Sequence, residues 1–289
     1  MQLSEEEFQS IKNYIISEGK RIYDEIKAKY ANYLKSDNKR KSLEQNNGKI
    51  MVHQYEEEDI KLFGGIKKVP PGHSGRKKQD NIIHVYPYSP QLSFVKDIKL
   101  LIQILINDII IHEIFHFYIQ PDLYDSNDIE HGDDVWFGHR LTEGIVQYFT
   151  NKYIKEHELA KSYTTYIEEV LLVENIVQDL KDQGKTEEEI MLILLNDNQH
   201  EIIDKCTNGK QIKKCFIAKT KLHQKINQFL RNVLTNLQND INEQEIYHSY
   251  VIMTDVDEIY NSLVTQFPTY RNELEEIFFE YQNETKKVL

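Results

Sequence analysis

Residues 98–119 read IKLLIQILINDIIIHEIFHFYI, and Pro121 follows them closely. Apolar residues fall on every side of a helix built from this stretch, and the proline ends it. Polar residues, among them Asn107 and Asp108, interrupt it before about 18 apolar residues run together, as a membrane span requires. The stretch therefore predicts a helix buried in the core of a globular protein.

The second half of this helix carries His112-Glu113-Ile114-Phe115-His116, an HExxH pattern. Residues four apart lie on one face of a helix, so both imidazoles can converge on a single Zn²⁺. Glu113 lies beside the first histidine, where it can reach a water held at the open coordination position. The pattern is typical of a zinc hydrolase.

Burial gives an independent reason to expect a metal ion. Apolar residues of the helix surround the two histidines and Glu113. Burying a polar group there without a hydrogen-bond partner costs on the order of 2–7 kcal/mol. A Zn²⁺ would satisfy them directly. A buried hydrogen-bond network, or a groove in which these side chains meet water, is the alternative.

A catalytic zinc needs a third protein ligand. A metzincin would have Gly at position 119 and His at position 122, but the chain has Ile119 and Asp122, which excludes that class. The downstream candidates are His131, Asp133, Asp134, His139 and Glu143. Glu143 has the most distinctive surroundings, because residues 141–149 read LTEGIVQYF and favour a second helix.

The pairing of HEIFH with EGIVQYF resembles the gluzincin metallopeptidases, in particular the peptidase unit of bacterial collagenases and their small relatives, the minigluzincins. The resemblance covers about residues 80–155. It implies that His112, His116 and Glu143 are zinc ligands and that Glu113 is the general base. It also implies that an extended substrate pairs with the edge strand that precedes the active-site helix, a role we assign to residues 81–86.

The chain departs from the gluzincin pattern at one position. Gluzincins often have an acidic residue four positions after the ligand glutamate, and this chain has Gln147 there. A glutamine can still accept a hydrogen bond from an imidazole N–H, although without charge. Asp108, one turn before His112, could supply a carboxylate instead, or could be a tolerated polar residue.

Other polar residues near the motif have open roles. His139 lies one turn before Glu143 and could be an alternative ligand, a transition-state donor or an exposed residue at the start of a helix. The acidic loop 122–134 could hold calcium, but its spacing matches no EF-hand. The candidates for a group that stabilises the oxyanion are Tyr163, Tyr166 and His200.

The pattern along the whole chain predicts a mostly α, α+β protein with a zincin-like arrangement. An amphipathic helix is expected over residues 4–35, and strands over residues 50–55 and 81–86, with a turn-rich loop at 64–78 between them. From residue 95 onwards the pattern is helical, apart from a loop at 121–138, with helix starts at Thr186 and at Thr254-Asp255 and a break at Pro268. We expect one catalytic unit made of residues 1–120, with the sheet and the active-site helix, and a helical subdomain of residues 121–289.

Composition limits the partners and the setting. With 289 residues, 40% of them hydrophobic, the chain can build a large core. Its formal net charge of -12 argues against nucleic acid and anionic membranes as partners. Residues 1–20 show no Sec-type signal, so we expect a cytoplasmic protein or one exported by a signal-less route. Cys206 and Cys215 are then reduced thiols, or a disulfide if the protein is exported.

These observations predict a zinc-dependent metallopeptidase that acts on a peptide or protein substrate, with no integral membrane segment. Two other functions stay open. One is a binding or regulatory protein with a structural or degenerate zinc site, although the intact Glu113 argues against it. The other is a secreted toxin or effector protease with a single target. The oligomeric state has no signature in the sequence.

Overall fold

The computed structural model describes residues 5–54, 60–61, 64–65, 69–74, 80–93, 95–119, 132–160, 166–237 and 256–286. The chain divides into two compact units. The first comprises Met1–Val173 and Gly184–Ile202, and the second comprises Glu174–Gln183 and Ile203–Leu289. The fold class is the predicted one, mostly helical α+β with a small N-terminal mixed sheet.

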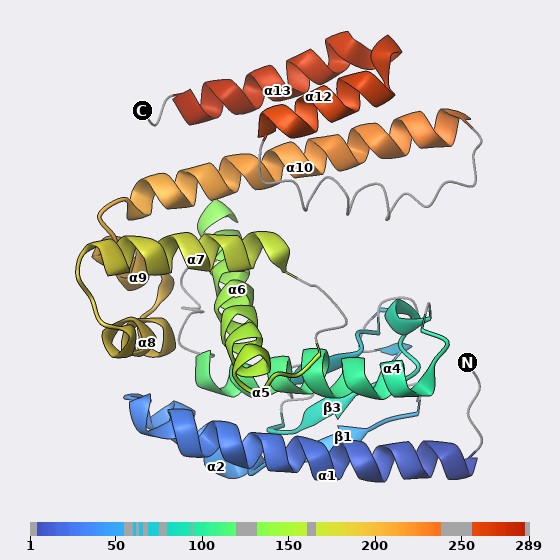
Figure 1. The fold of residues 1–289 in the computed structure, drawn as a ribbon, viewed down its shortest axis with the longest axis vertical. Coiled ribbons are helices and arrows are strands. Elements are labelled where there is room, and N and C mark those ends of the chain that lie inside the picture. The colour runs from blue at the N-terminus through green and yellow to red at the C-terminus, as the bar shows by residue number, and fades with distance from the viewer. Residues whose placement is uncertain are drawn as a thin grey trace. The chain divides into compact units, whose positions relative to one another are not determined.

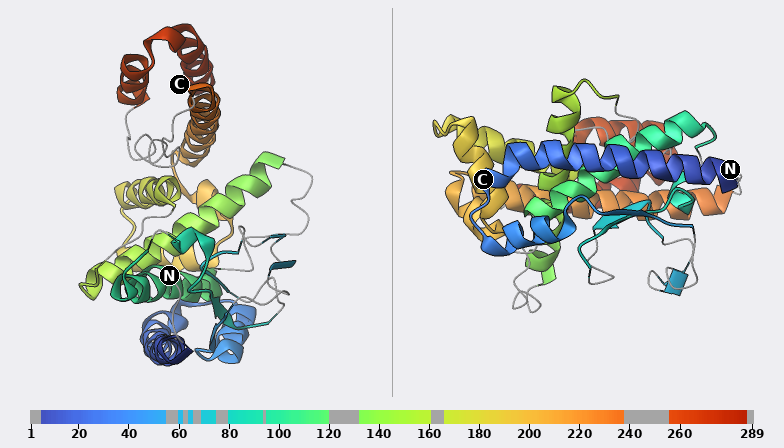
Figure 2. Two further views of the ribbon diagram at one scale, coloured as in Figure 1. Left: turned by 90° about the vertical axis from the view of Figure 1, so that its right-hand side faces the viewer. Right: turned by 90° about the horizontal axis from the view of Figure 1, so that it is seen from below.

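The first unit begins with two helices and a sheet. Helix α1 spans Glu5–Tyr30 and buries one apolar stripe, and α2 spans Asp37–Asn46. The three strands are β1 (Ile50–Val52), β2 (Gly72–Ser74) and β3 (Ile83–Val85). Their order is β1-β3-β2, with β1 parallel and β2 antiparallel to β3. Helix α1 packs on β1, and the sheet contacts the helix that carries the HExxH pattern (Figures 1 and 2).

Two expectations for this region need correction, and one helix was not predicted. The segment 81–86 provides the central strand β3, not an edge strand, because β2 pairs with its other side. The edge strand β2 lies inside the region 64–78, whose glycines and prolines favoured a loop. The polar segment after residue 35 forms α2, which Ser36 caps at its N-terminus and Asn47 ends in a left-handed conformation.

The helix predicted over residues 98–119 is confirmed. It is continuous through α4 (Ile98–Gln103), a π-helical segment (Ile104–Ile110) and α5 (Ile111–Ile119). Every residue of the last two segments is buried, as the apolar pattern predicts. π-Helical turns widen the helix and occur frequently at functional sites. Here the π-helical segment directly precedes the two histidines.

The helices that follow are α6 (Gly132–Glu156), α7 (Ile167–Asp182), α8 (Glu187–Asn196) and α9 (Gln199–Lys205). Helix α6 crosses α5 and packs against it (Figure 1). It begins at Gly132, so the end of the predicted loop 121–138 is helical. The predicted start at Thr186 is confirmed, since Thr186 and Glu189 form a capping box.

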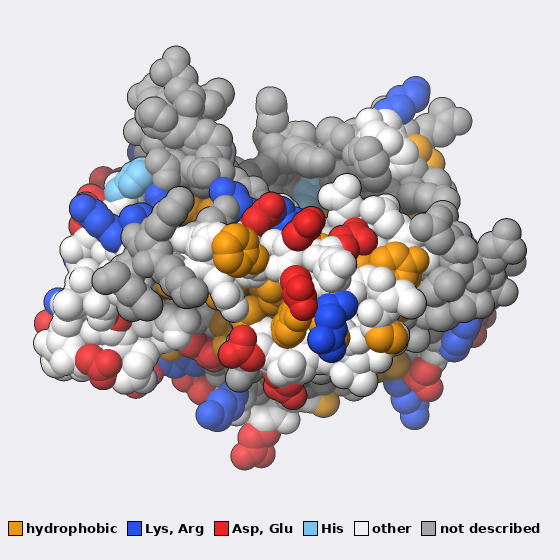
Figure 3. Space-filling view, turned by 90° about the horizontal axis from the view of Figure 1, so that it is seen from above, with side chains coloured by type: hydrophobic (Ala, Val, Ile, Leu, Met, Phe, Trp, Pro, Cys, Tyr) orange, Lys and Arg blue, Asp and Glu red, His pale blue; other side chains and the backbone are white. Residues whose placement is uncertain are grey.

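The second unit contains α10 (Gly209–Leu237), α12 (Val256–Gln266), the short 3₁₀ turn Pro268–Tyr270 and α13 (Arg271–Lys286). The break predicted at Pro268 is confirmed, while Thr254 and Asp255 lie outside the described residues. The three helices share a core that includes Leu222, Phe229, Leu263, Leu274 and Phe278. On the face shown in Figure 3, acidic and basic side chains are interspersed around small apolar groups.

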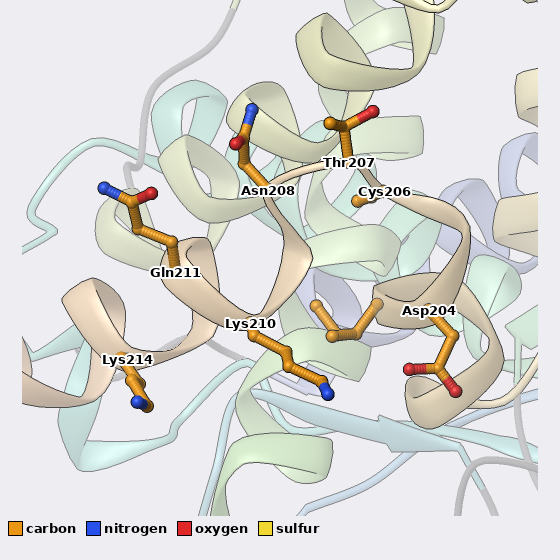
Figure 4. Close-up of a pocket in the computed structure, with 8 residues that line it drawn as sticks. Asp204, Cys206, Thr207, Asn208, Lys210, Gln211 and Lys214 are labelled. Atoms are coloured by element: carbon orange, nitrogen blue, oxygen red, sulfur yellow. The ribbon is translucent and has the colours of Figure 1, made fainter. Parts of the chain in front are cut away.

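The start of α10 borders a polar cavity of about 540 Å³ (Figure 4). Cys206 lines it as a reduced thiol, and Cys215 is also reduced, so the two form no disulfide. Burial, followed by the nearby Asp179, raises the pKa of Cys206 to about 12, so this thiol stays protonated at neutral pH. Among the described residues, no helix is long and apolar enough to cross a membrane.

Candidate metal centre

Helix α5 places the HExxH residues on a buried face. His112, Glu113 and His116 are 6%, 8% and 7% exposed. Their ligand atoms all lie within 4.8 Å of one another, and the three residues form a group that can hold a metal ion. The two imidazole rings meet edge to face, with their centroids 4.8 Å apart. The one-turn spacing thus brings two ring nitrogens to one point, as the sequence predicts.

Helix α6 brings Glu143 to the same point. Its Oε2 lies 3.2 Å from Nε2 of His112 and 3.6 Å from Nε2 of His116, and the two Nε2 atoms are 3.1 Å apart. Ligands at about 2.0–2.2 Å from a tetrahedral zinc lie about 3.3–3.6 Å from one another. The triangle of two nitrogens and one oxygen is therefore close to one face of a zinc coordination tetrahedron, and the donor set fits this metal.

Gln147, one turn further along α6, determines which nitrogen of His112 faces the centre. Its Oε1 lies 3.0 Å from Nδ1 of His112, and its Nε2 donates to Oδ1 of Asn151 at 3.0 Å. The amide oxygen must then accept, so Nδ1 of His112 carries the proton. Nε2 is left with its lone pair directed at Glu143 and His116, which is the form of histidine that binds a metal.

Gln147 thus occupies the position next to His112 that many gluzincins give to a carboxylate. Asp108, the other residue considered for this role, lies in the π-helical segment and is 4% exposed.

The pKa values of the centre are those expected at a site that binds a cation. Burial alone would raise the pKa of Glu143, but His116 and His112 outweigh it and lower this pKa to about 2. Burial alone would lower the pKa of His112, but the hydrogen bond and charge of Glu143 outweigh it and raise this pKa. A buried carboxylate is thus kept charged by the two imidazoles, as it would be by a bound metal ion.

The edge strand β2 approaches this centre closely. A Cβ atom on Gly72 would lie 2.4 Å from Cγ2 of Ile109 and 3.5 Å from Cγ of Glu113. Only glycine allows the strand to lie this near the helix. The region that the sequence analysis described as a loop therefore forms the strand beside Glu113.

Tyr166, just before α7, stacks on the ring of His112. The two rings are parallel within 8°, with their centroids 5.4 Å apart. Burial, followed by the charges of Glu143 and Glu113, raises the pKa of the tyrosine, so its hydroxyl keeps its proton. Of the three residues proposed as donors to an oxyanion, Tyr166 is the one that contacts a histidine of the centre. His200 is exposed on α9, and Tyr163 lies outside the described residues.

The remaining ligand candidates are less well placed or are not described. Nδ1 of His139 lies 3.8 Å from Oε1 of Glu143, and its side chain is 52% exposed. His131, the acidic loop 122–130 with its proposed calcium site, and the side chains of Asp133 and Asp134 lie outside the described residues.

Sequence reasoning missed the residues that place Tyr166. Gly144 on α6 lets α7 approach so closely that a Cβ atom there would lie 2.4 Å from the backbone oxygen of Glu169. Arg140, also on α6, pairs through Nε with Oε1 of Glu169 at 2.7 Å. The glycine directly after Glu143 was the available signal, because a glycine inside a helix often marks a close approach of another element.

Comparisons with known proteins assign neither a family nor a function to this site. No family model matches the chain, and neither a curated protein nor a solved structure matches it.

Proposed function

We propose that this protein is a zinc-dependent metallopeptidase, with His112, His116 and Glu143 as the metal ligands and Glu113 as the general base. The observation that carries the proposal is the triangle of ligand atoms, with sides of 3.1, 3.2 and 3.6 Å, next to a buried glutamate. Two imidazoles and one carboxylate are also the donor set of catalytic zinc sites that leave one coordination position for water.

The three ligands alone would suit a structural zinc ion equally well. Glu113 distinguishes a catalytic zinc site from a structural one. A structural zinc is closed by four protein ligands and has no need for a base. Glu113 is 8% exposed, and it precedes His116 on the same buried face. Burying a second carboxylate beside Glu143 costs free energy, and the activation of a bound water accounts for its presence there.

A bound Zn²⁺ would supply the Lewis acidity that polarises the substrate carbonyl and makes water acidic enough to lose a proton near neutral pH. Glu113 takes that proton while the water oxygen attacks the carbonyl carbon. As the C–N bond breaks, Glu113 returns the proton to the leaving nitrogen, so the carboxylate is regenerated. Gln147 holds His112 in the form whose Nε2 faces the metal.

The edge strand supports a peptide as the substrate. Within the described part of the chain β2 pairs with β3 at one edge of the sheet, and it passes beside Glu113 at Gly72. An extended peptide can add to an edge strand as a further strand, through the backbone N–H and C=O groups. We therefore assign to Gly72–Ser74 the substrate-pairing role that was expected of residues 81–86.

The test is cleavage of a peptide library by the zinc-loaded protein, with and without a chelator, for the wild type and for Glu113→Gln. We expect chelator-sensitive cleavage by the wild type, a loss of at least about 10²-fold in the variant, and equal zinc content. Glu188→Gln is the matched control, because Glu188 is an exposed glutamate on α8 of the same unit. Full activity of Glu113→Gln would contradict the mechanism.

The same experiment separates the alternative functions. A binding or regulatory protein would retain zinc and cleave no peptide in either form. A toxin or effector protease with a narrow target would leave the library intact but would cleave one protein in a cell extract, and Glu113→Gln would abolish that cleavage.

A further inference from the structure

The face of the sheet that points away from α5 carries three histidines. His73 on β2 and His84 on β3 are paired across the sheet, and His53 directly follows β1. Gly72 is directed at α5, since a Cβ atom there would lie 3.5 Å from Cγ of Glu113, so its neighbour His73 is directed to the opposite face. The ring of His84 contacts both other rings, with centroids 5.0 Å from His53 and 4.7 Å from His73. We call His53, His73 and His84 the histidine cluster.

A chain of hydrogen bonds runs from a carboxylate through two of these rings. The carboxylate oxygens of Asp80 lie 3.0 and 3.1 Å from Nε2 of His84, and Nδ1 of His84 lies 2.7 Å from Nε2 of His53. His84 is 1% exposed and His53 is 7% exposed. An ionised carboxylate only accepts, so Nε2 of His84 carries a proton. When His84 is neutral, its Nδ1 therefore accepts, and Nε2 of His53 donates.

The bond between the two imidazoles holds a single proton. If the pair takes up one additional proton, an N–H group still faces a lone pair, and the bond persists. With a second additional proton, both nitrogens of both rings would be donors. Two N–H groups would then face each other across 2.7 Å, and two positive charges would repel. The closed pair therefore holds at most one additional proton.

The titratable groups that the structure describes against this pair are Asp80, His73 and Tyr86. His73 stacks on His84, and Tyr86 stacks on His53 with the ring centroids 4.9 Å apart. The hydroxyl of Tyr86 lies 3.4 Å from Nε2 of His73. Asp80 supplies one negative charge, which already bonds to His84. Acid therefore adds further positive charge, from His73, to a pair that has one carboxylate beside it.

Two backbone hydrogen bonds attach the neighbouring segments to β3 beside these rings. The N–H of His53 donates to the carbonyl oxygen of Val85 at 2.9 Å, and the N–H of Tyr86 donates to that of Pro71 at 2.8 Å. The first bond joins the end of β1 to β3, and the second joins β3 to the residue before β2. Separation of the rings in the histidine cluster would therefore act on both edges of the sheet.

We propose that the histidine cluster is an acid-sensitive switch that keeps the sheet closed near neutral pH and releases β2 in acid. An unperturbed histidine takes up its proton near pH 6.5. The open sheet can bind one proton more than the closed one, so acid favours the open sheet, by about tenfold for each pH unit below about 6.5. Because β2 passes Glu113 at Gly72, its release also withdraws the strand from that glutamate. The switch belongs to the sheet and operates whether or not the protein cleaves peptides.

Hydrogen exchange of the full chain between about pH 8 and pH 5, corrected for intrinsic exchange rates, tests the switch in the wild type. The amides of His53 and Tyr86 report the two edges of the sheet. Their protection should fall by about tenfold for each pH unit below about 6.5. Protection that stays constant over this range would overturn the proposal.

His53→Gln is the matched variant. A glutamine amide can donate to neutral His84 or accept from its protonated form, so the bond survives in both states. The excluded proton is then absent, and the loss of protection per pH unit should be about tenfold smaller than in the wild type. His200→Gln, an exposed change on α9, is the control and should behave as the wild type does. The same pH dependence in His53→Gln and the wild type would contradict the switch.

The nitrogen chemical shifts of the histidine rings give a test that needs no variant. At about pH 8 they should place a proton on Nε2 of both His53 and His84. As the pH falls, the second additional proton should be taken up together with the loss of protection at the amide of His53. Two fully charged rings with this amide still protected would overturn the proposal.

Discussion

Two buried polar clusters of this protein satisfy their charges in different ways. In the second unit, Asp179 is 8% exposed, and its carboxylate accepts hydrogen bonds from the backbone N–H groups of Thr207 and Asn208 and from side-chain amides. In the first unit, His112, His116 and Glu143 turn two ring nitrogens and a carboxylate oxygen towards one another.

The difference between them separates a structural cluster from a functional one. Every bond to Asp179 joins a donor to an acceptor, so the carboxylate completes the start of α10 without help from outside the chain. At the metal centre Gln147 occupies Nδ1 of His112, so the Nε2 that faces the acceptor oxygen of Glu143 needs either a proton of its own or a metal ion shared with the carboxylate. Convergent acceptors need a cation, and matched donors and acceptors do not.

The largest expected effect comes from removing the carboxylate of the metal centre. Glu143→Ala should weaken zinc binding by more than about 100-fold, the upper range for changes to groups that only orient a ligand. Asp179→Ala, which removes an equally buried carboxylate elsewhere, should leave zinc affinity unchanged. Competition with a zinc-sensitive dye measures both. Equal zinc affinity of Glu143→Ala and the wild type would transfer the ligand role to His139 or an aspartate.

Zinc should also stabilise the two regions unequally. Free zinc at 100 times its Kd stabilises the state that binds it by about 2.7 kcal/mol. Hydrogen exchange should therefore slow in α5 and α6, the helices that carry the ligands, more than in α10, α12 and α13. Equal protection of all five helices would mean that the two units unfold together, and protection confined to α10 would place the zinc elsewhere.

Substitution of Gln147, the hydrogen-bond partner of His112, should have the next largest effect on zinc affinity. Gln147→Ala removes the acceptor that fixes the ring, and such losses typically weaken metal binding by about 10- to 100-fold. Gln147→Glu should strengthen binding, because a charged acceptor makes the imidazole a better ligand. Lys155→Ala is the control, since Lys155 is an exposed residue in the last turn of α6. The prediction is wrong if all three variants bind zinc as the wild type does.

The smallest effect is expected for the substitution of Asp179, which should change only the stability of the second unit. Asp179→Ala should lower the free energy of unfolding of this unit by about 0.5–2 kcal/mol, as for other lost helix caps. Burial raises the pKa of Asp179, but hydrogen bonds from Asn208, Thr207 and Gln183 outweigh it and lower this pKa below 3.8. The stabilisation is therefore present above pH 3.8 and lost as the pH falls through the lowered value. Urea unfolding at pH 7 and pH 3 should show a smaller difference between variant and wild type at pH 3.

The parts of the fold that depend on local sequence were predictable. The apolar pattern predicts the helix of residues 98–119, the capping box predicts the start of α8, and Pro268 predicts the break before α13. Each signal acts within one or two helical turns of the residues that carry it. The approach of His112 to His116 belongs to this class, because helical spacing alone brings them together.

The parts that depend on contacts between distant segments were harder to predict. The glycines and prolines around β2 resemble a loop, and only pairing with β3 makes Gly72–Ser74 a strand. The same pairing places β3 in the centre of the sheet. Tyr166 was one of three candidates, and the contacts that favour it come from Gly144 and Arg140 on another helix. Tertiary packing decides such positions, and no local pattern encodes it.

Anomalous diffraction at the zinc absorption edge, from crystals of the zinc-loaded protein, would locate the metal ion itself. The account predicts one strong peak at bonding distance, about 2.0–2.2 Å, from Nε2 of His112, Nε2 of His116 and a carboxylate oxygen of Glu143. A zinc peak bound elsewhere, with these three side chains joined only by hydrogen bonds, would contradict it.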